Sequence, residues 1–228
     1  MVMLPAALAF APAAHAQTAN EQPVENLPAR DDASTDKFQK DAEQDRAFAK
    51  SNSAAPRRAL EQWAGCVARK NAGEATRVLT MDFTTPTYGR AIRMLAEEDK
   101  ACMGFRGTMR SAGLLFAGEM AEALLESDST PLASRLARAA SSPATPAFSF
   151  TDRVMICAAR SAPSEVGALF ATTRDSAEEN AAVAALTTPM GLCAQAAQAR
   201  KPLSVSPAGL RAMLATASFR SLASTKAA

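Results

Sequence analysis

The sequence contains a single histidine, His15, which lies in an apolar stretch at the N-terminus. The first sixteen residues are MVMLPAALAFAPAAHA, and they end in a small-x-small triplet typical of a signal-peptide cleavage site. No Lys or Arg precedes the apolar run, but the rest of the pattern predicts a signal peptide over residues 1–16. A chain cleaved there has no histidine, which excludes Ser-His-Asp and Cys-His catalysis and every zinc site that uses histidine.

Aromatic residues and long apolar runs are also scarce. The chain has one Trp and one Tyr, and no later stretch approaches the roughly 20 apolar residues that a membrane-spanning helix needs. We therefore expect no transmembrane anchor. The basic pairs Arg57-Arg58 and Arg135/Arg138 lack the interleaved aromatic residues typical of single-stranded nucleic-acid sites, so we expect no nucleic-acid partner. A glycine-rich phosphate loop is missing too, and we expect no cofactor.

The residues that are abundant favour helices. Alanine dominates the apolar content, accompanied by Leu, Met, Arg and Glu, and alternating β-branched runs are nearly absent. The sequence therefore predicts an all-α fold. Residues 17–56 differ, because they are polar, carry an acidic excess and hold almost no large apolar side chain. Such a segment buries too little surface to offset its ordering entropy, so we predict a disordered tail there.

The four cysteines are part of an internal repeat. Cys66 and Cys102 have the same separation as Cys157 and Cys193. A match at one fixed offset, without gaps, is the signature of a duplicated structural unit. Further identical pairs at the Cys66-to-Cys157 offset include Ala68 and Ala159, Arg69 and Arg160, Glu74 and Glu165, Ala91 and Ala182, Leu95 and Leu186, Ala117 and Ala208, Gly118 and Gly209, and Ala121 and Ala212.

The duplication predicts the domain organisation. We expect two tandem helical repeat units of about four short helices each, over residues 57–126 and 151–222. Residues 127–150 would connect them and contain one short helix, and residues 223–228 would fray. Each unit resembles a self-contained module, so we predict the disulfides Cys66–Cys102 and Cys157–Cys193, which export to an oxidising compartment would allow. Each closed loop stabilises by about 3–4 kcal/mol in the chain-entropy model.

Capping residues mark the helix ends. Asn71 with Glu74 three residues later predicts a capping box, and Pro189 predicts the end of the helix that begins after Ser176. A hydroxyl residue directly before proline is typical of a helix start. This pattern occurs at Thr85-Pro86, Thr130-Pro131 and Ser206-Pro207.

Without histidine, carboxylate clusters are the main candidates for acid–base catalysis. The clusters are Glu97-Glu98-Asp99, the pair Glu119 and Glu122 on one helix face, and Glu178-Glu179. Paired carboxylates can hydrolyse glycosides, but no aromatic cleft accompanies these. We interpret them as solvated helix faces, with Glu178-Glu179 favoured by the helix dipole.

Two further patterns have a simpler explanation than chemistry. Ser34 and Lys37 fit a Ser-x-x-Lys motif, but its companion motifs are missing and it lies in the polar tail, so we interpret it as chance. The methionines of the first unit are not spaced as copper ligands, and we expect them to fill the core. They are Met81, Met94, Met103, Met109 and Met120.

The sequence leads to three hypotheses of function. The first is a periplasmic or secreted, non-enzymatic helical-repeat protein that binds a protein partner in the cell envelope, using the groove between its units. The second is a carrier of a small apolar molecule or lipid, held between helices that bear Phe105, Phe116 and Phe170. The third is a hydrolase that uses carboxylates alone.

Overall fold

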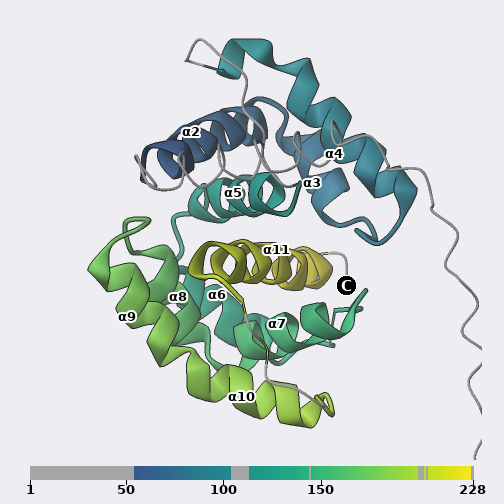
Figure 1. Ribbon diagram of the computed structural model, residues 1–228. Helices are drawn as coiled ribbons and strands as arrows, with labels where there is room; N and C mark the ends of the chain where they lie inside the picture. The colour runs from purple at the N-terminus through teal and green to yellow at the C-terminus, as the bar shows by residue number, and fades with distance from the viewer. Residues whose placement is uncertain (1–53, 104–112, 144, 200–202, 204, 227–228) are drawn as a thin grey trace, which may run out of the picture. The chain divides into compact units, whose positions relative to one another are not determined.

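The structure is a computed structural model that describes residues 54–103, 113–143, 145–199, 203 and 205–226. The predicted signal peptide, most of the polar tail, His15 and the Ser34–Lys37 motif lie outside the described residues. Within them the chain is helical and has no strand, which confirms the all-α prediction (Figure 1). The helices are α2 (Ala54–Lys70), α3 (Ala72–Leu79), α4 (Pro86–Glu98), a short 3-10 helix η1 (Lys100–Cys102), α5 (Gly113–Glu126), α6 (Leu132–Ala139), α7 (Phe150–Ser161), α8 (Pro163–Phe170), α9 (Ala177–Ala185), α10 (Thr187–Ala196) and α11 (Pro207–Lys226).

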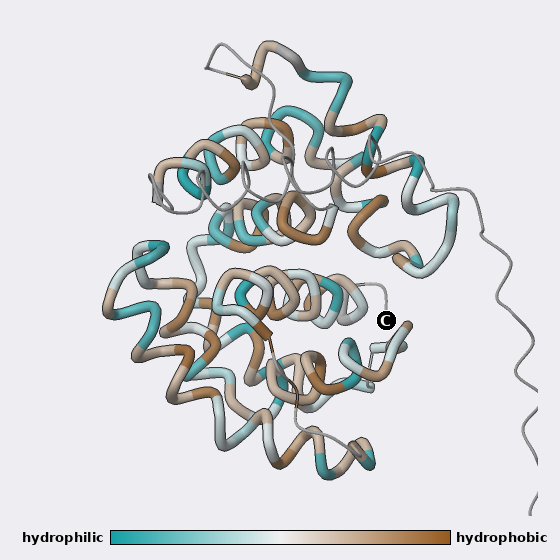
Figure 2. Tube along the Cα trace, viewed as in Figure 1, coloured by the Kyte–Doolittle hydropathy of each residue, from teal (hydrophilic) through white to brown (hydrophobic). Residues whose placement is uncertain are grey.

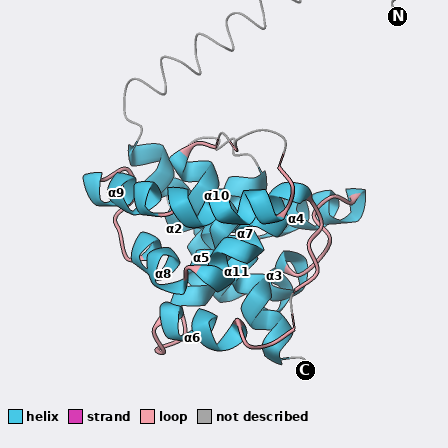
Figure 3. Cartoon of the chain, turned by 90° about the horizontal axis from the view of Figure 1, so that it is seen from below, coloured by secondary structure: helices cyan, strands magenta, loops and turns pink. Residues whose placement is uncertain are grey.

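Five of these helices form a stack. In Figure 1 they follow one another as α2, α5, α11, α7 and α10, and each neighbouring pair is in contact. Helices α3 and α4 pack beside α2 and α5, whereas α6, α8 and α9 lie on the other side of the stack, against α7 and α11 (Figures 1 and 3). The helices α5 and α11 are therefore central, and each contacts helices on both of its sides.

Alanine lets these helices pack closely. The buried side chains form one apolar cluster around α2 and α5 and a second around α7, α8 and α11. Figure 2 shows strongly hydrophilic residues in peripheral segments such as the loop between α8 and α9, and also within the central helices α5 and α11. At the crossing of α5 and α11, a Cβ added to Gly118 would lie 2.5 Å from Cα of Ala212 and closer still to its Cβ. Gly118 therefore sets how closely the two central helices approach.

Each half of the chain contains one disulfide that joins two of its helices. Cys66–Cys102 ties α2 to η1, and Cys157–Cys193 ties α7 to α10. The Cα atoms of each pair are 5.6 Å and 5.8 Å apart, within the usual range. This is the pairing predicted from the equal cysteine spacing.

The predicted caps differ in outcome. The side chain of Thr85 accepts a hydrogen bond from the Tyr88 backbone N–H, and Ser206 accepts one from the Gly209 N–H, so both sites are N-caps as predicted. The capping box at Asn71 is wrong: its amide makes no cap bond and instead donates to Asp99 Oδ2 at 2.6 Å. Helix α6 begins only at Leu132, without a side-chain cap.

Two helix ends also differ from the sequence prediction. Pro189 does not end a helix but lies in the first turn of α10, which the sequence did not indicate as a separate helix. Proline is tolerated there because the first N–H groups of a helix have no intrahelical acceptor. At the other end of the chain, α11 runs to Lys226, beyond the predicted boundary at residue 222.

Candidate ligand-binding site

A cavity of about 1070 Å³ lies between the two central helices and their neighbours on the α4 side. Its volume is at the upper end of the range typical of small-molecule sites. Residues of α2, α3, α4, α5, α7 and α11 line this central cavity, and most of its wall is apolar. The apolar side chains are Trp63, Leu79, Phe83, Ile92, Ala96, Met103, Leu114, Phe116, Met155 and Met213.

Helix α4 presents one face to the central cavity. Tyr88, Ile92 and Ala96 follow one another at four-residue spacing, which places them on one side of a helix. Thr85 caps the helix one turn before Tyr88, so the start of this face is fixed by a backbone hydrogen bond. Gly89, which directly follows Tyr88, also lines the cavity, and a Cβ added there would meet nothing within 4 Å.

The opposite wall contains a buried ion pair. Arg220 on α11 donates to Asp152 in the first turn of α7, and only 3 % and 7 % of these residues is exposed. The other Asp152 oxygen accepts from the Phe148 backbone N–H at 2.8 Å. The Arg220 guanidinium also stacks on two rings, 4.8 Å from the Phe148 centroid and 5.7 Å from that of Phe83. Both charges are thus held in place by the protein itself.

Tyr88 contributes an uncharged polar group to this wall. Burial raises the pKa of its phenol above the ordinary value, and the nearby Arg220 charge lowers the pKa only in part. The hydroxyl therefore stays protonated at physiological pH. It makes no hydrogen bond to any described residue, so it is available to a ligand both as donor and as acceptor.

A second group of charges lies on the other side of α11. Arg211 and Arg220 are about two and a half helical turns apart, which places them on opposite faces of that helix. Arg211 belongs to a set of linked ion pairs that we call the charge network. Its members are Arg57, Glu61, Glu119, Glu122, Arg174, Asp175, Glu179 and Arg211.

Arg211 connects two carboxylates at the centre of the charge network. Its guanidinium binds Glu122 with two hydrogen bonds of 3.0 Å and 2.5 Å, and it donates to Glu179 at 3.1 Å. All three side chains are at most 2 % exposed. The same guanidinium donates to the Thr172 hydroxyl and backbone carbonyl, so the buried charges have dense hydrogen bonding.

Two arginines extend the charge network outward. Arg57 on α2 donates two hydrogen bonds to Glu179, of 2.8 Å and 3.0 Å. Burial alone would raise the pKa of Glu179, but the bonds from Arg57 and from the Asp175 N–H outweigh it and lower this pKa to about 2. Arg174 pairs with Glu119, and here burial outweighs the arginine and raises the pKa of Glu119.

These positions correct our interpretation of the acidic residues. Glu122 and Glu179 are buried, and Glu119 is almost so, instead of forming solvated helix faces. Glu97 and Glu178 are exposed, as expected. No sequence pattern indicates the pairings of the charge network, because its partners are far apart along the chain. One clue existed: Arg211 interrupts an apolar run between Leu210 and Leu214.

The methionines and phenylalanines are divided among different environments. Met120 is fully buried, as predicted, whereas Met94 is 69 % exposed. Phe116 lines the central cavity, and Phe170 instead lies beneath the guanidinium of Arg211. Phe105 and Met109 fall outside the described residues.

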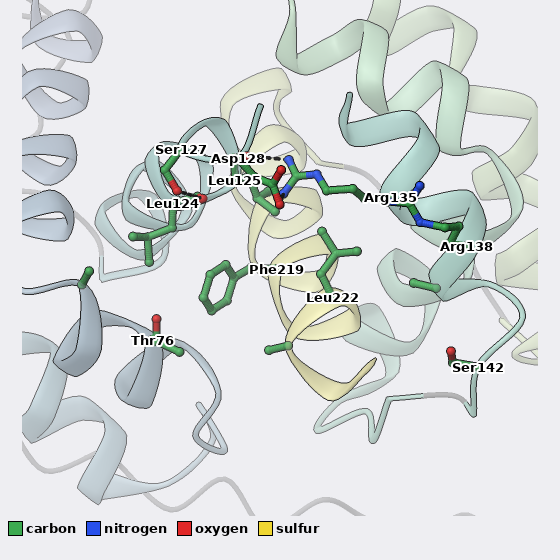
Figure 4. A pocket seen from close by; sticks show the side chains of 13 residues that line it. Thr76, Leu124, Leu125, Ser127, Asp128, Arg135, Arg138, Ser142, Phe219 and Leu222 are labelled. Atoms are coloured by element: carbon green, nitrogen blue, oxygen red, sulfur yellow. Dashed lines mark hydrogen bonds and ion pairs between the residues drawn. The ribbon is translucent and has the colours of Figure 1, made fainter. Parts of the chain in front are cut away.

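A smaller cavity of about 570 Å³ lies among α3, α5, α6 and α11. Figure 4 shows Phe219 and Leu222 of α11 between Thr76 on one side and the arginines Arg135 and Arg138 on the other. Arg135 is already engaged, because it donates to the Leu125 carbonyl and pairs with Asp128.

No described helix is long and apolar enough to cross a membrane. In the same part of the chain, no three His, Cys, Asp or Glu side chains are grouped to hold a metal ion. Comparison of the chain with protein-family models, curated proteins and solved structures finds no match.

Proposed function

We propose that the protein is an exported binding protein that holds a small, largely apolar molecule in the central cavity. The observation that carries this proposal is the cavity itself: about 1070 Å³, with mostly apolar walls and a few fixed polar groups. Ligand sites in proteins have this composition, because apolar walls supply affinity and a few polar groups orient the ligand. The paired cysteines and the predicted signal peptide support export to an oxidising compartment.

The helix boundaries support the proposal that two repeat units build this site. Helices α3 and α8 begin at Ala72 and Pro163, and α4 and α9 at Pro86 and Ala177. Both separations equal the Cys66-to-Cys157 offset. The caps before α4 and α9 correspond in the same way, since Thr85 and Ser176 each accept a hydrogen bond three residues ahead.

The same offset relates the central cavity to the charge network. Phe83 and Tyr88, which line the cavity, correspond to Arg174 and Glu179 of the network. Phe148 packs on Phe83 with ring centroids 5.7 Å apart. At the same offset, the residue that corresponds to Phe148 is Arg57, and Arg57 binds Glu179 in the charge network. We infer that two equivalent places exist between the units. Ion pairs occupy one of them and fasten the units together, and the other is the open, apolar binding site.

Native mass spectrometry of the protein purified from its own cells tests this proposal. We expect a mass in excess of the bare polypeptide, and an apolar molecule in the organic extract. The Gly89→Trp variant should lose that molecule, because Gly89 faces the cavity and has space around it. Gly73→Trp is the matched control, since Gly73 is an exposed helical glycine that also has nothing within 4 Å but does not line the cavity.

The protein-adaptor hypothesis, which was the first hypothesis from the sequence, is the second candidate here. The observation in its favour is that Phe83 and Leu114, on the cavity wall, are 38 % and 42 % exposed. Exposed apolar side chains around a groove are typical of partner-binding surfaces. A stoichiometric protein retained after crosslinking in the cell envelope, with no small molecule in the extract, would favour the adaptor and contradict the carrier.

The hydrolase hypothesis has the least support. Its two carboxylates, Glu119 and Glu122, are engaged by Arg174 and Arg211. Neither residue lines the central cavity.

A further inference from the structure

The charges on the wall of the central cavity balance. Its only charged lining residues, within the described part of the chain, are Arg93, Glu97, Asp152 and Arg220. Arg93 and Glu97 are exposed on α4, one turn apart. Asp152 and Arg220 are buried and paired with each other. The two buried charges of the wall are therefore already paired with each other, whereas Arg93 and Glu97, which make no ion pair with a described residue, are opposite in sign and exposed to solvent.

This balance disfavours an ionised ligand group. A carboxylate next to Arg220 would also lie near Asp152, and an ammonium next to Asp152 would also lie near Arg220. Transferring either ion from water into the protein interior is unfavourable unless an opposite charge compensates it. Asp152 and Arg220 already compensate each other, so neither is available to compensate the charge of an ionised ligand group.

Uncharged polar groups fit the same wall well. The Tyr88 hydroxyl has no hydrogen-bond partner among the described residues and can both donate and accept. The Ser149 hydroxyl accepts from the Asp152 N–H as the cap of α7, and its own proton remains available to a ligand oxygen. Both residues line the cavity, as does the Asp152–Arg220 pair.

We propose that the occupant of the central cavity is an uncharged amphiphile. Its hydroxyl, ester or amide group would bond to Tyr88 and Ser149 near the Asp152–Arg220 pair. Its hydrocarbon part lies against the apolar wall formed by Trp63, Ile92 and Phe116. This inference rests on the proposed function, since it names the chemical class that the binding site selects.

Three probes with one hydrocarbon chain and different head groups test the inference. These are monooleoylglycerol, oleic acid and oleylamine, used below their aggregation limits at mildly alkaline pH, where the acid and the amine are ionised. Trp63, the single tryptophan, lies on the cavity wall, so its fluorescence reports binding. We expect monooleoylglycerol to bind at least about tenfold more tightly than both ionised probes, given the cost of burying an ion. Equal or tighter binding of either ionised probe overturns the inference but not the proposed function. Failure of all three to bind, with no molecule retained by the native protein, overturns both.

Asp152→Asn should switch this selectivity. The variant keeps an oxygen to accept from Phe148 but leaves the Arg220 charge uncompensated. We expect the affinity for oleic acid relative to monooleoylglycerol to rise by about tenfold or more, as an uncompensated buried charge predicts. Glu98→Gln is the control: it makes the same change in net charge at an exposed residue of α4 that does not line the cavity, so the ratio should stay within about twofold because solvent screens exposed charges. An unchanged ratio in Asp152→Asn overturns the inference.

Tyr88→Phe provides an independent test if Asp152→Asn does not fold. The variant removes only the hydroxyl, which makes no hydrogen bond to a described residue. We expect monooleoylglycerol to bind about three- to tenfold more weakly, the loss typical of one hydrogen bond. The affinity for oleylamine should change less than that for monooleoylglycerol. If both affinities stay as in the native protein, the proposed position of the head group is wrong.

Discussion

Arg211 and Glu122 form a buried, two-bonded ion pair between α11 and α5, with distances of 3.0 Å and 2.5 Å. The two residues are 89 positions apart in the chain, and each is 2 % exposed. Removing one partner of such a pair strands the other charge in the interior. This pair and the contact of Gly118 with Ala212 therefore hold the central helices together.

Arg211→Met is expected to destabilise the protein by about 3–5 kcal/mol, because Glu122 and Glu179 lose a buried partner. Methionine is the residue at the corresponding place of the first unit, Met120, so the side-chain volume is suitable. Urea unfolding with the disulfides intact measures the change. Arg77→Met, which breaks the exposed pair with Glu74, should have little effect. Equal loss in both variants would contradict a central role for Arg211.

Gly118→Ala should also destabilise the protein, because the added methyl group would overlap Ala212. The central helices would have to move apart, and overpacking of this kind typically costs about 1–3 kcal/mol. Gly73→Ala is the control, since its Cβ has free space on α3 and alanine favours a helix. The expected result is opposite signs for the two substitutions in thermal or urea unfolding. A stabilised Gly118→Ala would mean that α5 and α11 are not in close contact.

The two disulfides should contribute similarly to stability. Each joins cysteines with a sequence separation of 36, so each closes a loop of the same length. Replacing either pair with serine is expected to lower the free energy of unfolding by about 3–4 kcal/mol in the chain-entropy model. Peptide mapping without reduction should first show both linkages. Mixed linkages between the first and second pairs would contradict the fold.

Acid should weaken the charge network through Glu179. Its pKa falls from an ordinary value of 4.5 to about 2 in the folded protein. A carboxylate with a lowered pKa stabilises the fold above its unfolded pKa, and that contribution is lost as the pH falls from about 4.5 to 2. Burial raises the pKa of Glu119, so its contribution to the free energy of unfolding changes with pH only above about pH 4.5. Glu119 therefore does not offset the loss of stability that Glu179 causes at lower pH.

Glu179→Gln tests this assignment. The variant should be less stable than the native protein near neutral pH and should lose less stability between pH 4.5 and 2, because no charge remains to be neutralised. Unfolding free energies measured across this range give the comparison. Parallel curves for the two proteins would show that another group titrates. Glu98→Gln is a suitable control, since Glu98 is exposed and makes no ion pair with a described residue.

Local chemistry explains what could be predicted from the sequence. The N-caps at Thr85 and Ser206 depend only on residues within one helical turn. The disulfide pairing follows from the equal spacing of the cysteines in the two copies of the repeat. Two predictions from local sequence were wrong, one because of a tertiary contact and the other because proline is tolerated in the first turn of a helix. Asn71 bonds to Asp99 instead of its own helix, and Pro189 occupies a helix turn that needs no N–H.

The site itself could not be predicted from the sequence. Arg57 finds its partner Glu179 at a separation of 122 residues, and nothing in the pattern of either segment indicates the other. The central cavity is harder still to foresee, because it depends on how side chains from six helices leave space unfilled. The four-residue spacing of Tyr88 and Ile92 indicates one face of a helix, but the pattern is the same for a cavity wall and for a packed core.

A crystal structure of the protein purified from its own cells, without added lipid, tests the central claim most directly. The account predicts continuous density for an elongated apolar molecule in the central cavity, with a polar atom within hydrogen-bond distance of the Tyr88 hydroxyl. A cavity filled only by ordered water, or closed by movement of α4 against α7 and α11, would contradict it.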